Sequence, residues 1–339
     1  MLRLSSVFFC LLLNVQQVFA EDFSGFKNKL DLAEDYLVVS PSRSITILER
    51  LDNLDNAPPE LFIRWHQIYA RTAVYTSHYD QLHKSLEAIF KHHKTAYFQQ
   101  NMTSIMSALG IWLRHAGYFN DAELAFECSY KYAKNDRQRL TLINSIAIVA
   151  SSKGDYIKAR NLYIDNHKIA LDLNLSNVAA LIESNLGYLA LYEGNTADAE
   201  SWLRKAFINY QKINKRAGQV SAGLNLLMVF LIQENVVNFE RLHEPTSTLT
   251  HAFPNEAKKA LLLWLEAGYK KLTGGYISRN EKEQLQVAYK QLESDKIKML
   301  VHNHLAKKLE MSLDLPTTPT PKRFSSTWFN LVKTCNWEI

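Results

Sequence analysis

Few residues of this chain have the types and spacing that catalysis requires. Two pairs of close carboxylates, Glu34-Asp35 and Asp52 with Asp55, have the separation of an acid and a base, but both pairs also fit exposed helix faces or helix ends. The chain has no glycine-rich phosphate loop and no Gly-x-Ser-x-Gly motif. We therefore expect no catalysis and no cofactor, and we keep an unrecognised enzyme site near Glu34 or Asp52 as an alternative.

Histidine and cysteine spacing predicts no metal site. His92-His93 are adjacent, and neither this pair nor a second pair two residues apart would place two zinc ligands on one helix face. Beyond the amino-terminal apolar run, the cysteines are Cys128 and Cys335. We expect Cys128 to be a small buried side chain and Cys335 to be free. A disulfide between them is the alternative, which an oxidising compartment would permit.

The dominant pattern is a repeat of 37 to 41 residues, in which a tight turn separates two apolar helical segments. Reference residues near the end of each first helix are Gly110, Ala147, Gly187, Met228 and Gly268. Turn formers follow seven residues later at Gly117, Gly154, Gly194, Asn235 and Gly275, and alanines five residues further at Ala122, Ala159 and Ala199. Glycine and asparagine tolerate the left-handed backbone that ends a helix. A unit of this kind cannot bury its own apolar face, so it must stack on its neighbours.

Apolar residues between the turns recur at the three- and four-residue steps of a helix. In residues 141–152 they form one broad stripe that includes Leu142, Ile146 and Val149. These windows give little support for strands. Without its first twenty residues the chain would have 319 residues, slightly more than the roughly 250–300 at which a single compact core stops growing. We therefore predict an all-α solenoid over residues 21–313.

The first twenty residues predict a secretory signal peptide. Arg3 supplies positive charge, residues 7–13 form a short apolar run, and Val18-Phe19-Ala20 resembles a cleavage site. The apolar run is far shorter than the ~20 residues that span a bilayer. We expect export, with the periplasm favoured and secretion as the alternative.

The carboxyl-terminal residues 314–339 differ from the repeats. Residues 316–321 hold three prolines and predict a stiff spacer, which a basic and aromatic tail follows. The tail has three alternatives: docking on the solenoid, on a partner, or on a membrane surface. The net charge of +5 comes without a dense basic cluster, so we expect no binding of nucleic acid.

The repeat resembles the tetratricopeptide repeat (TPR) family. Two copies carry the resemblance, namely Gly110, Leu113, Gly117, Phe119, Ala122 and Phe126, and then Leu186-Gly187, Gly194, Ala199, Leu203 and Ala206. The match is best over residues 103–213 and stays in register from Leu30 to Leu292. The units are longer than the family's 34 residues, and the central copies lack the usual proline. The resemblance implies a right-handed α-solenoid whose role is interaction.

The resemblance also implies a binding face, because the first helices of TPR units line the concave side. The inward positions on these helices carry Ser107, Ile111, Arg114, Asn144, Ile148, Ser184, Asn185, Tyr188, Tyr192 and Asn225. Asparagine amides can bind a peptide backbone, and Arg114 can hold a carboxylate in a forked pair. Such a groove suits an extended or helical peptide. We therefore expect an exported interaction scaffold or adaptor, with a periplasmic ligand-sensing or regulatory protein, or a cell-envelope enzyme, as alternatives.

Overall fold

The computed structural model describes residues 23–76, 78–315 and 322–337, and within these ranges the regular elements are all helical. The expected signal peptide and the expected proline-rich spacer at 316–321 lie outside the described residues. Among the described residues, no helix combines the length and the hydropathy that a membrane crossing requires.

The helices follow one another in pairs along the chain. They are α2 (Ser24–Val39), α3 (Pro41–Glu49), η1 (Leu54–Asn56), α4 (Pro59–Thr76), α5 (Tyr79–Phe90), α6 (Ala96–Gln100), α7 (Met102–His115), α8 (Phe119–Lys131), α9 (Asp136–Ser152), α10 (Tyr156–Asp172), α11 (Ser176–Tyr192), α12 (Thr196–Lys212), α13 (Arg216–Ile232), α14 (Val236–Ala252), α15 (Glu256–Leu272), α16 (Arg279–Gln291), α17 (Asp295–Val301), η2 (His302–Ala306) and α18 (Phe329–Thr334). From α7 to α16, each helix packs on the next one in sequence. The contact of α14 with α15 is smaller than that of α13 with α15. The predicted all-α architecture is confirmed.

The turns within the pairs use left-handed backbone, as the sequence predicts. Gly117, Gly154 and Gly194 have φ of 85°, 86° and 83°. In the next two units the left-handed residues are Glu234 and Gly274, with φ of 56° and 86°. The sequence prediction of Asn235 and Gly275 is therefore one residue late. Because the Asn235 side chain accepts a hydrogen bond from the Asn238 amide at 3.1 Å and so caps α14, the residue before it has to make the turn.

Small residues let the two helices of a unit approach closely. Ala122, Ala159 and Ala199 are completely buried. A Cβ atom added to Gly187 would lie 2.5 Å from Cγ of Leu203 on the partner helix, which leaves no room for a larger side chain. The predicted roles of the reference residue and of the alanine are therefore confirmed in the central units.

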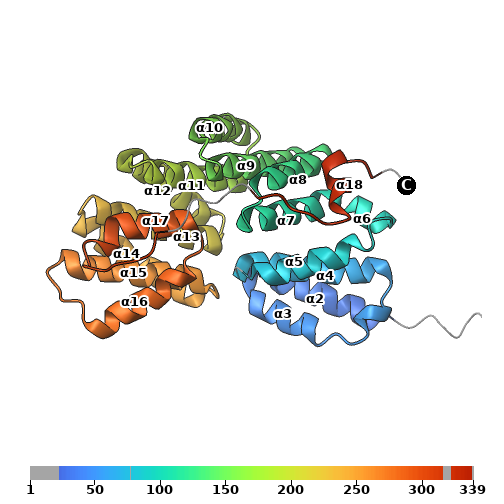
Figure 1. Cartoon of the computed structure of the whole chain (residues 1–339), viewed down its shortest axis with the longest axis horizontal. Coiled ribbons are helices and arrows are strands. Elements are labelled where there is room, and N and C mark those ends of the chain that lie inside the picture. Colours follow the sequence, from blue (N-terminus) through green and yellow to red (C-terminus); the bar gives the residue numbers. More distant parts are fainter. Residues whose placement is uncertain (1–22, 77, 316–321, 338–339) are drawn as a thin grey trace, which may run out of the picture.

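The pairs follow a horseshoe from α2 and α3 at one end to α15 and α16 at the other (Figure 1). The first helices α7, α9 and α11 lie toward the hollow, and the second helices α8, α10 and α12 lie outside it. Consecutive first helices from α7 to α15 also contact one another across the unit boundaries. Such contacts are expected on the inner side of a curved stack, where neighbouring units are closest.

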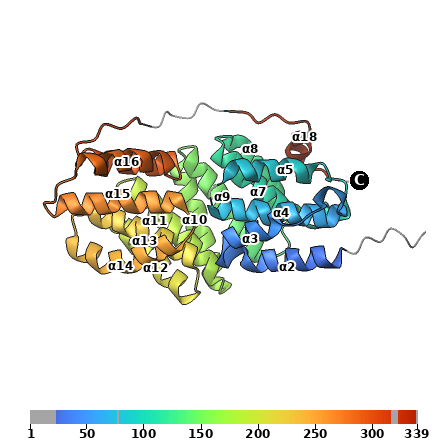
Figure 2. The same cartoon turned by 90° about the horizontal axis from the view of Figure 1, so that it is seen from below.

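After α16 the chain leaves the repeat pattern. The helix α17 and the element η2 turn back, and Leu305 of η2 packs against Leu231 of α13 and Gly268 of α15. The chain then passes α16, where the Tyr289 hydroxyl donates to the Asp314 carbonyl at 3.1 Å. Figure 2 shows the described parts of the tail at opposite ends of the molecule, beside α16 and beside α5 and α8.

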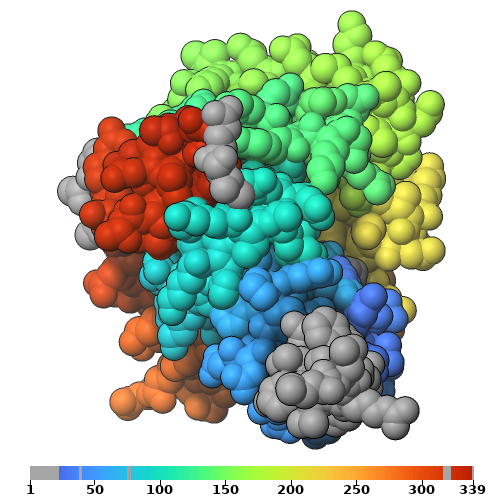
Figure 3. All heavy atoms as spheres, turned by 90° about the vertical axis from the view of Figure 1, so that its right-hand side faces the viewer, coloured from blue at the N-terminus to red at the C-terminus, as the bar shows by residue number. Residues whose placement is uncertain are grey.

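The tail docks on the outside of the solenoid. Phe324, Phe329 and Trp337 are buried, and Trp328 stacks on Phe90 of α5 with ring centroids 3.9 Å apart. Figure 3 shows this segment as a compact patch over the neighbouring helices. Of the three alternatives for the tail, the structure has docking on the solenoid, which uses the aromatic side chains that a membrane surface would need.

A disulfide joins Cys128 of α8 to Cys335 of the tail, with Cα atoms 5.5 Å apart. The expectation of two unpaired cysteines is therefore wrong. Sequence reasoning failed because the cysteines are 207 residues apart and only the aromatic docking of the tail brings them together. The buried Asp121 helps to hold the tail, since its carboxylate accepts a hydrogen bond from the Phe324 amide at 2.8 Å.

Candidate binding site on the concave face

The carboxyl-terminal ends of the inner helices form a strip along the hollow, and residues 293–308 of the same chain lie on it. The Lys296 ammonium donates to the carbonyl oxygen and the hydroxyl of Ser151, at 2.6 and 2.7 Å, where α9 ends. The Tyr192 hydroxyl at the end of α11 donates to Sδ of Met299 at 3.4 Å. Lys308 makes an ion pair with Glu234, just after α13, at 2.9 Å. We call the surface formed by Ser151, Tyr156, Tyr192 and Glu234 the concave strip.

The Lys296 ammonium lies in an aromatic cage. The ring centroids of Tyr156 and Tyr192 are 4.8 and 4.7 Å from Nζ, and the two rings are 5.8 Å apart. Such a geometry attracts a cation electrostatically. Burial nevertheless lowers the pKa of Lys296 to about 8, because Glu193 only partly offsets the desolvation and the Arg114 charge acts in the same direction.

A second group of charges surrounds Glu293, which lies two residues before the start of α17. Lys258 of α15 makes an ion pair with the Glu293 carboxylate at 2.6 Å. This lysine, and then the Arg114 charge, lower the pKa of Glu293 against the opposing effect of burial. The amino terminus of α15 and the carboxyl terminus of α7 therefore combine into a site for a carboxylate.

Arg114 and His115 interact directly with each other. An Arg114 guanidinium nitrogen lies 2.7 Å from Nε2 of His115, and the His115 ring stacks on Tyr79 at 3.7 Å. Burial, and then the Arg114 charge, lower the pKa of His115 to about 3, so its ring is neutral and accepts the arginine hydrogen bond. Burial also lowers the pKa of Arg114.

All ten residues predicted from the sequence lie on α7, α9, α11 or α13, but they have different environments. Arg114, Tyr188 and Tyr192 face the segment that occupies the strip: the buried Tyr188 hydroxyl lies beside Ser294 without hydrogen-bond geometry. The Asn144 carboxamide accepts a hydrogen bond from Asn185 at 2.8 Å, so this oxygen already pairs across two neighbouring helices. Ser184 is buried, and the other four, Ser107, Ile111, Ile148 and Asn225, are half-buried.

Sequence reasoning did not find Ser151, Tyr156, Lys258, Glu293 or Lys296. Ser151 and Tyr156 flank the turn at Gly154. Their position beside this turn could have predicted them, because the turns end the inner helices at the hollow. Glu293 and Lys296 had none, since nothing local in the sequence indicates that the chain turns back after α16.

Of the carboxylates considered for catalysis, Glu34 lies in an ion-pair network and Asp52 lies on the surface. Glu34 makes ion pairs with Arg64 and Arg71 at 2.9 and 2.8 Å, and Asp52 is exposed at a helix end. Among the described residues, no group of histidine, cysteine, aspartate and glutamate side chains has the arrangement of a metal site.

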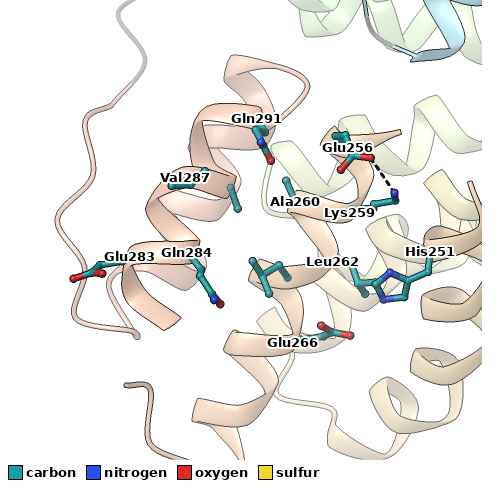
Figure 4. Close-up of a pocket in the computed structure, with 12 residues that line it drawn as sticks. His251, Glu256, Lys259, Ala260, Leu262, Glu266, Glu283, Gln284, Val287 and Gln291 are labelled. Carbon is teal, nitrogen blue, oxygen red and sulfur yellow. Dashed lines mark hydrogen bonds and ion pairs between the residues drawn. The ribbon is translucent and has the colours of Figure 1, made fainter. Parts of the chain in front are cut away.

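A separate open pocket of about 500 Å³ lies between α14, α15 and α16 (Figure 4). Val287 and Gln284 of α16 form one wall, and Leu262 with Ala260 of α15 forms the floor. Lys259 and Glu256, which make an ion pair at 2.9 Å, belong to its polar rim. The pocket does not include the concave strip.

A comparison with family models finds no match, and a comparison with curated protein sequences finds none either. Among solved structures, the chain is similar to a Rap protein complexed with Competence and Sporulation Factor, with a TM-score of 0.55, 12% identity, and coverage of 84% of this chain and 90% of that one. It is also similar to aspartyl phosphate phosphatase F from Bacillus subtilis, with a TM-score of 0.55, 11% identity, and coverage of 95% and 86%. These similarities concern the fold: this chain is an all-α protein with the TPR-like helix-pair packing of the Rap proteins.

Proposed function

We propose that this protein is an exported, non-catalytic scaffold or adaptor that binds a peptide or protein segment on its concave face. One observation carries the proposal: residues 293–308 of the chain already lie along the inner helices as a bound peptide would. Their contacts include an ammonium cage and a paired carboxylate. Groups of this kind recognise specific side chains, whereas an ordinary solenoid interior needs only apolar packing.

The similar structures support the proposal at the level of the fold. The Rap protein was crystallised in complex with Competence and Sporulation Factor, so a chain of this architecture accommodates a partner. Because the sequence identity is only 12%, this similarity does not identify the partner of the present protein.

The disulfide between Cys128 and Cys335 supports export. Disulfides of this type persist in oxidising compartments and are rare in the cytosol. Together with the signal-like first twenty residues, the disulfide favours the periplasm or the extracellular space as the place of binding.

Site-specific photo-crosslinking in the native cell tests this function. A photoreactive residue at Ser107 or Asn225 on the inner helices should capture a partner, and a Tyr192→Ala substitution should reduce the capture. The control positions are Ile157 and Ile208, which are exposed on α10 and α12. Capture from the control positions alone, or capture that Tyr192→Ala leaves unchanged, would contradict binding on the concave face.

The pocket between α14, α15 and α16 favours a second candidate function, the sensing of a small ligand. Its volume of about 500 Å³ lies within the range of roughly 300–1,000 Å³ that is usual for such sites. A ligand that raises the melting temperature of the wild type but not of a Val287→Glu variant would identify this pocket as the site.

A further inference from the structure

We propose that residues 293–308 are an intramolecular ligand that keeps the concave strip closed, and that the partner is an amphipathic helical peptide with a carboxylate and, three residues later, an ammonium group. This inference depends on the proposed function and adds its regulation and its ligand chemistry. We call residues 293–308 the plug.

The plug has the pattern of a peptide in a groove and departs from that of a repeat. Its apolar residues Ile297, Leu300, Val301 and Leu305 are buried and recur at steps of three and four. Amphipathic helices bind grooves with this spacing of anchors. On its other side, Lys296 and Met299 contact residues that are 145 and 107 positions away in the sequence. The plug therefore lies on the strip, while Asp295, Asn303, Lys307 and Lys308 remain exposed.

The Glu293 carboxylate and the Lys296 ammonium define the chemistry that a competing partner needs. Lys258 holds the Glu293 carboxylate, with Arg114 and His115 nearby. Three residues later, the ammonium of Lys296 lies between two tyrosine rings. A partner with glutamate or aspartate just before the start of a helix, and with lysine three positions later in the first turn, would satisfy both sites at once.

The plug pays a cost for docking that a competing peptide can avoid. The helix α17 and the element η2 that continues it cover residues 295–306, and a helix of about this length is marginal alone in water. The Lys296 ammonium loses hydration on docking and the Arg114 charge repels it, while Glu193 supplies opposite charge. A partner that is already helical would avoid the entropic cost of ordering this segment.

The probe for this inference is a synthetic, fluorescently labelled peptide with the sequence of residues 291–308. In wild-type protein the covalently linked plug competes at a high effective concentration, so we expect weak binding of the peptide. In the full-length double variant Lys296→Ala with Met299→Ala, which we call the released variant, the plug loses its contacts to Ser151, Tyr156 and Tyr192. We expect this variant to bind the peptide at least tenfold more tightly than the wild type does.

Matched variants locate the effect. Lys298→Ala removes a lysine of the same helix that makes an ion pair with Asp295 of that helix, at 3.8 Å, and should leave the affinity at the wild-type value. Adding Tyr192→Ala to the released variant should abolish the gain, as should alanine at the position of Lys296 in the peptide. Equal affinity of wild type and released variant would overturn the closure but leave concave binding intact. Absence of peptide binding in both would overturn the ligand chemistry, and photo-crosslinking would then decide separately whether the concave face binds at all.

Hydrogen exchange of the wild type provides a second measurement that does not depend on the folding of any variant. An excess of the isotope-labelled peptide should speed the exchange of backbone amides in α17, because the peptide displaces it. Unchanged exchange in α17 at peptide concentrations at which the wild type itself is saturated with peptide would contradict the proposal.

Discussion

At the scale of single residues, the protonation of Lys296 is set by the loss of hydration on burial and by the attraction of the groups around its ammonium. The tyrosine cage contributes roughly 0.5–2 kcal/mol of cation–π attraction, and the two oxygens of Ser151 replace part of the lost hydration. The pKa of about 8 shows that desolvation still exceeds these gains. Below this pH the charged lysine weakens docking, and above it the neutral amine strengthens docking, up to the ordinary lysine pKa of 10.5.

Ala159 tests the packing within a unit. This side chain is completely buried between α9 and α10, so Ala159→Phe should overpack the pair and lower the free energy of unfolding by about 1–3 kcal/mol. Urea denaturation measures the change. The control is Ile157→Phe on the same helix, where the side chain is 77% exposed, and which should have little effect. A silent Ala159→Phe would mean that the helices of the unit pack in another register.

His115 should make the stability fall in acid. Its pKa is about 3 in the folded protein and 6.5 ordinarily, so between these values the unfolded state binds more protons than the folded state. The free energy of unfolding therefore decreases as the pH falls from 6.5 toward 3, with a limiting slope of about 1.4 kcal/mol per pH unit. His66, with a pKa of about 4, adds to the slope over part of this range.

The slope can be measured by urea denaturation at several pH values between 7 and 4. His115→Gln should flatten it, because the variant side chain does not titrate, whatever its stability at neutral pH. His251→Gln, at an exposed histidine, serves as the control and should retain the wild-type slope. An unchanged slope in His115→Gln would show that the ring is not held neutral by its surroundings.

At the scale of elements, the long repeat helices differ from the short elements near the carboxyl terminus. The long helices α9 to α15 have 17 residues each and pack on both neighbours, so tertiary contacts and length both stabilise them. The six-residue helix α18 and the segment of α17 and η2 at residues 295–306 depend on docking. Short docked elements open at the lowest free energy in a protein, which is why regulation is expected in α17.

The disulfide should determine how firmly the tail is held. Cross-linking residues that are 207 positions apart restricts the unfolded chain, and such bridges typically contribute about 2–4 kcal/mol. The double variant Cys128→Ser with Cys335→Ser should therefore have a lower free energy of unfolding by this amount, measured by urea denaturation. A reducing agent should reproduce the loss in the wild type and change nothing in the double variant. An effect of the reducing agent on the double variant would exclude this bridge as its cause.

At the scale of the whole molecule, stacking of helix pairs produces a horseshoe whose two ends approach each other across the hollow (Figure 1). The contact between Glu293 and Lys258, close to Arg114 and His115, places the end of the solenoid beside its middle. A closed plug therefore couples units that are far apart in the sequence, and its release should loosen the curvature.

Small-angle scattering can detect this loosening. The released variant Lys296→Ala with Met299→Ala should have a larger radius of gyration than the wild type, while circular dichroism shows the same helix content apart from α17. An identical scattering curve for both proteins would mean that the horseshoe keeps its curvature without the plug. A strong sheet signal in either protein would contradict the solenoid itself.

The sequence by itself determined the helices and the turns, because these depend on neighbouring residues. Apolar steps of three and four, glycines at 117, 154 and 194, and buried alanines act within one unit, so a local pattern is sufficient to predict them. The same geometry placed Arg114, Tyr188 and Tyr192 at the hollow. At Glu234 even the local prediction was one residue off, because capping by Asn235 competed with the turn.

Only the tertiary structure decided what fills the hollow and where the tail lies. Lys296 reaches Ser151 over 145 positions, and Cys335 reaches Cys128 over 207. No periodic pattern encodes such contacts, since they arise when burial of apolar surface by the plug and the tail outweighs the entropy of ordering them. The repeat defines a surface that can bind, and the path of the chain after α16 decides that this surface first binds its own protein.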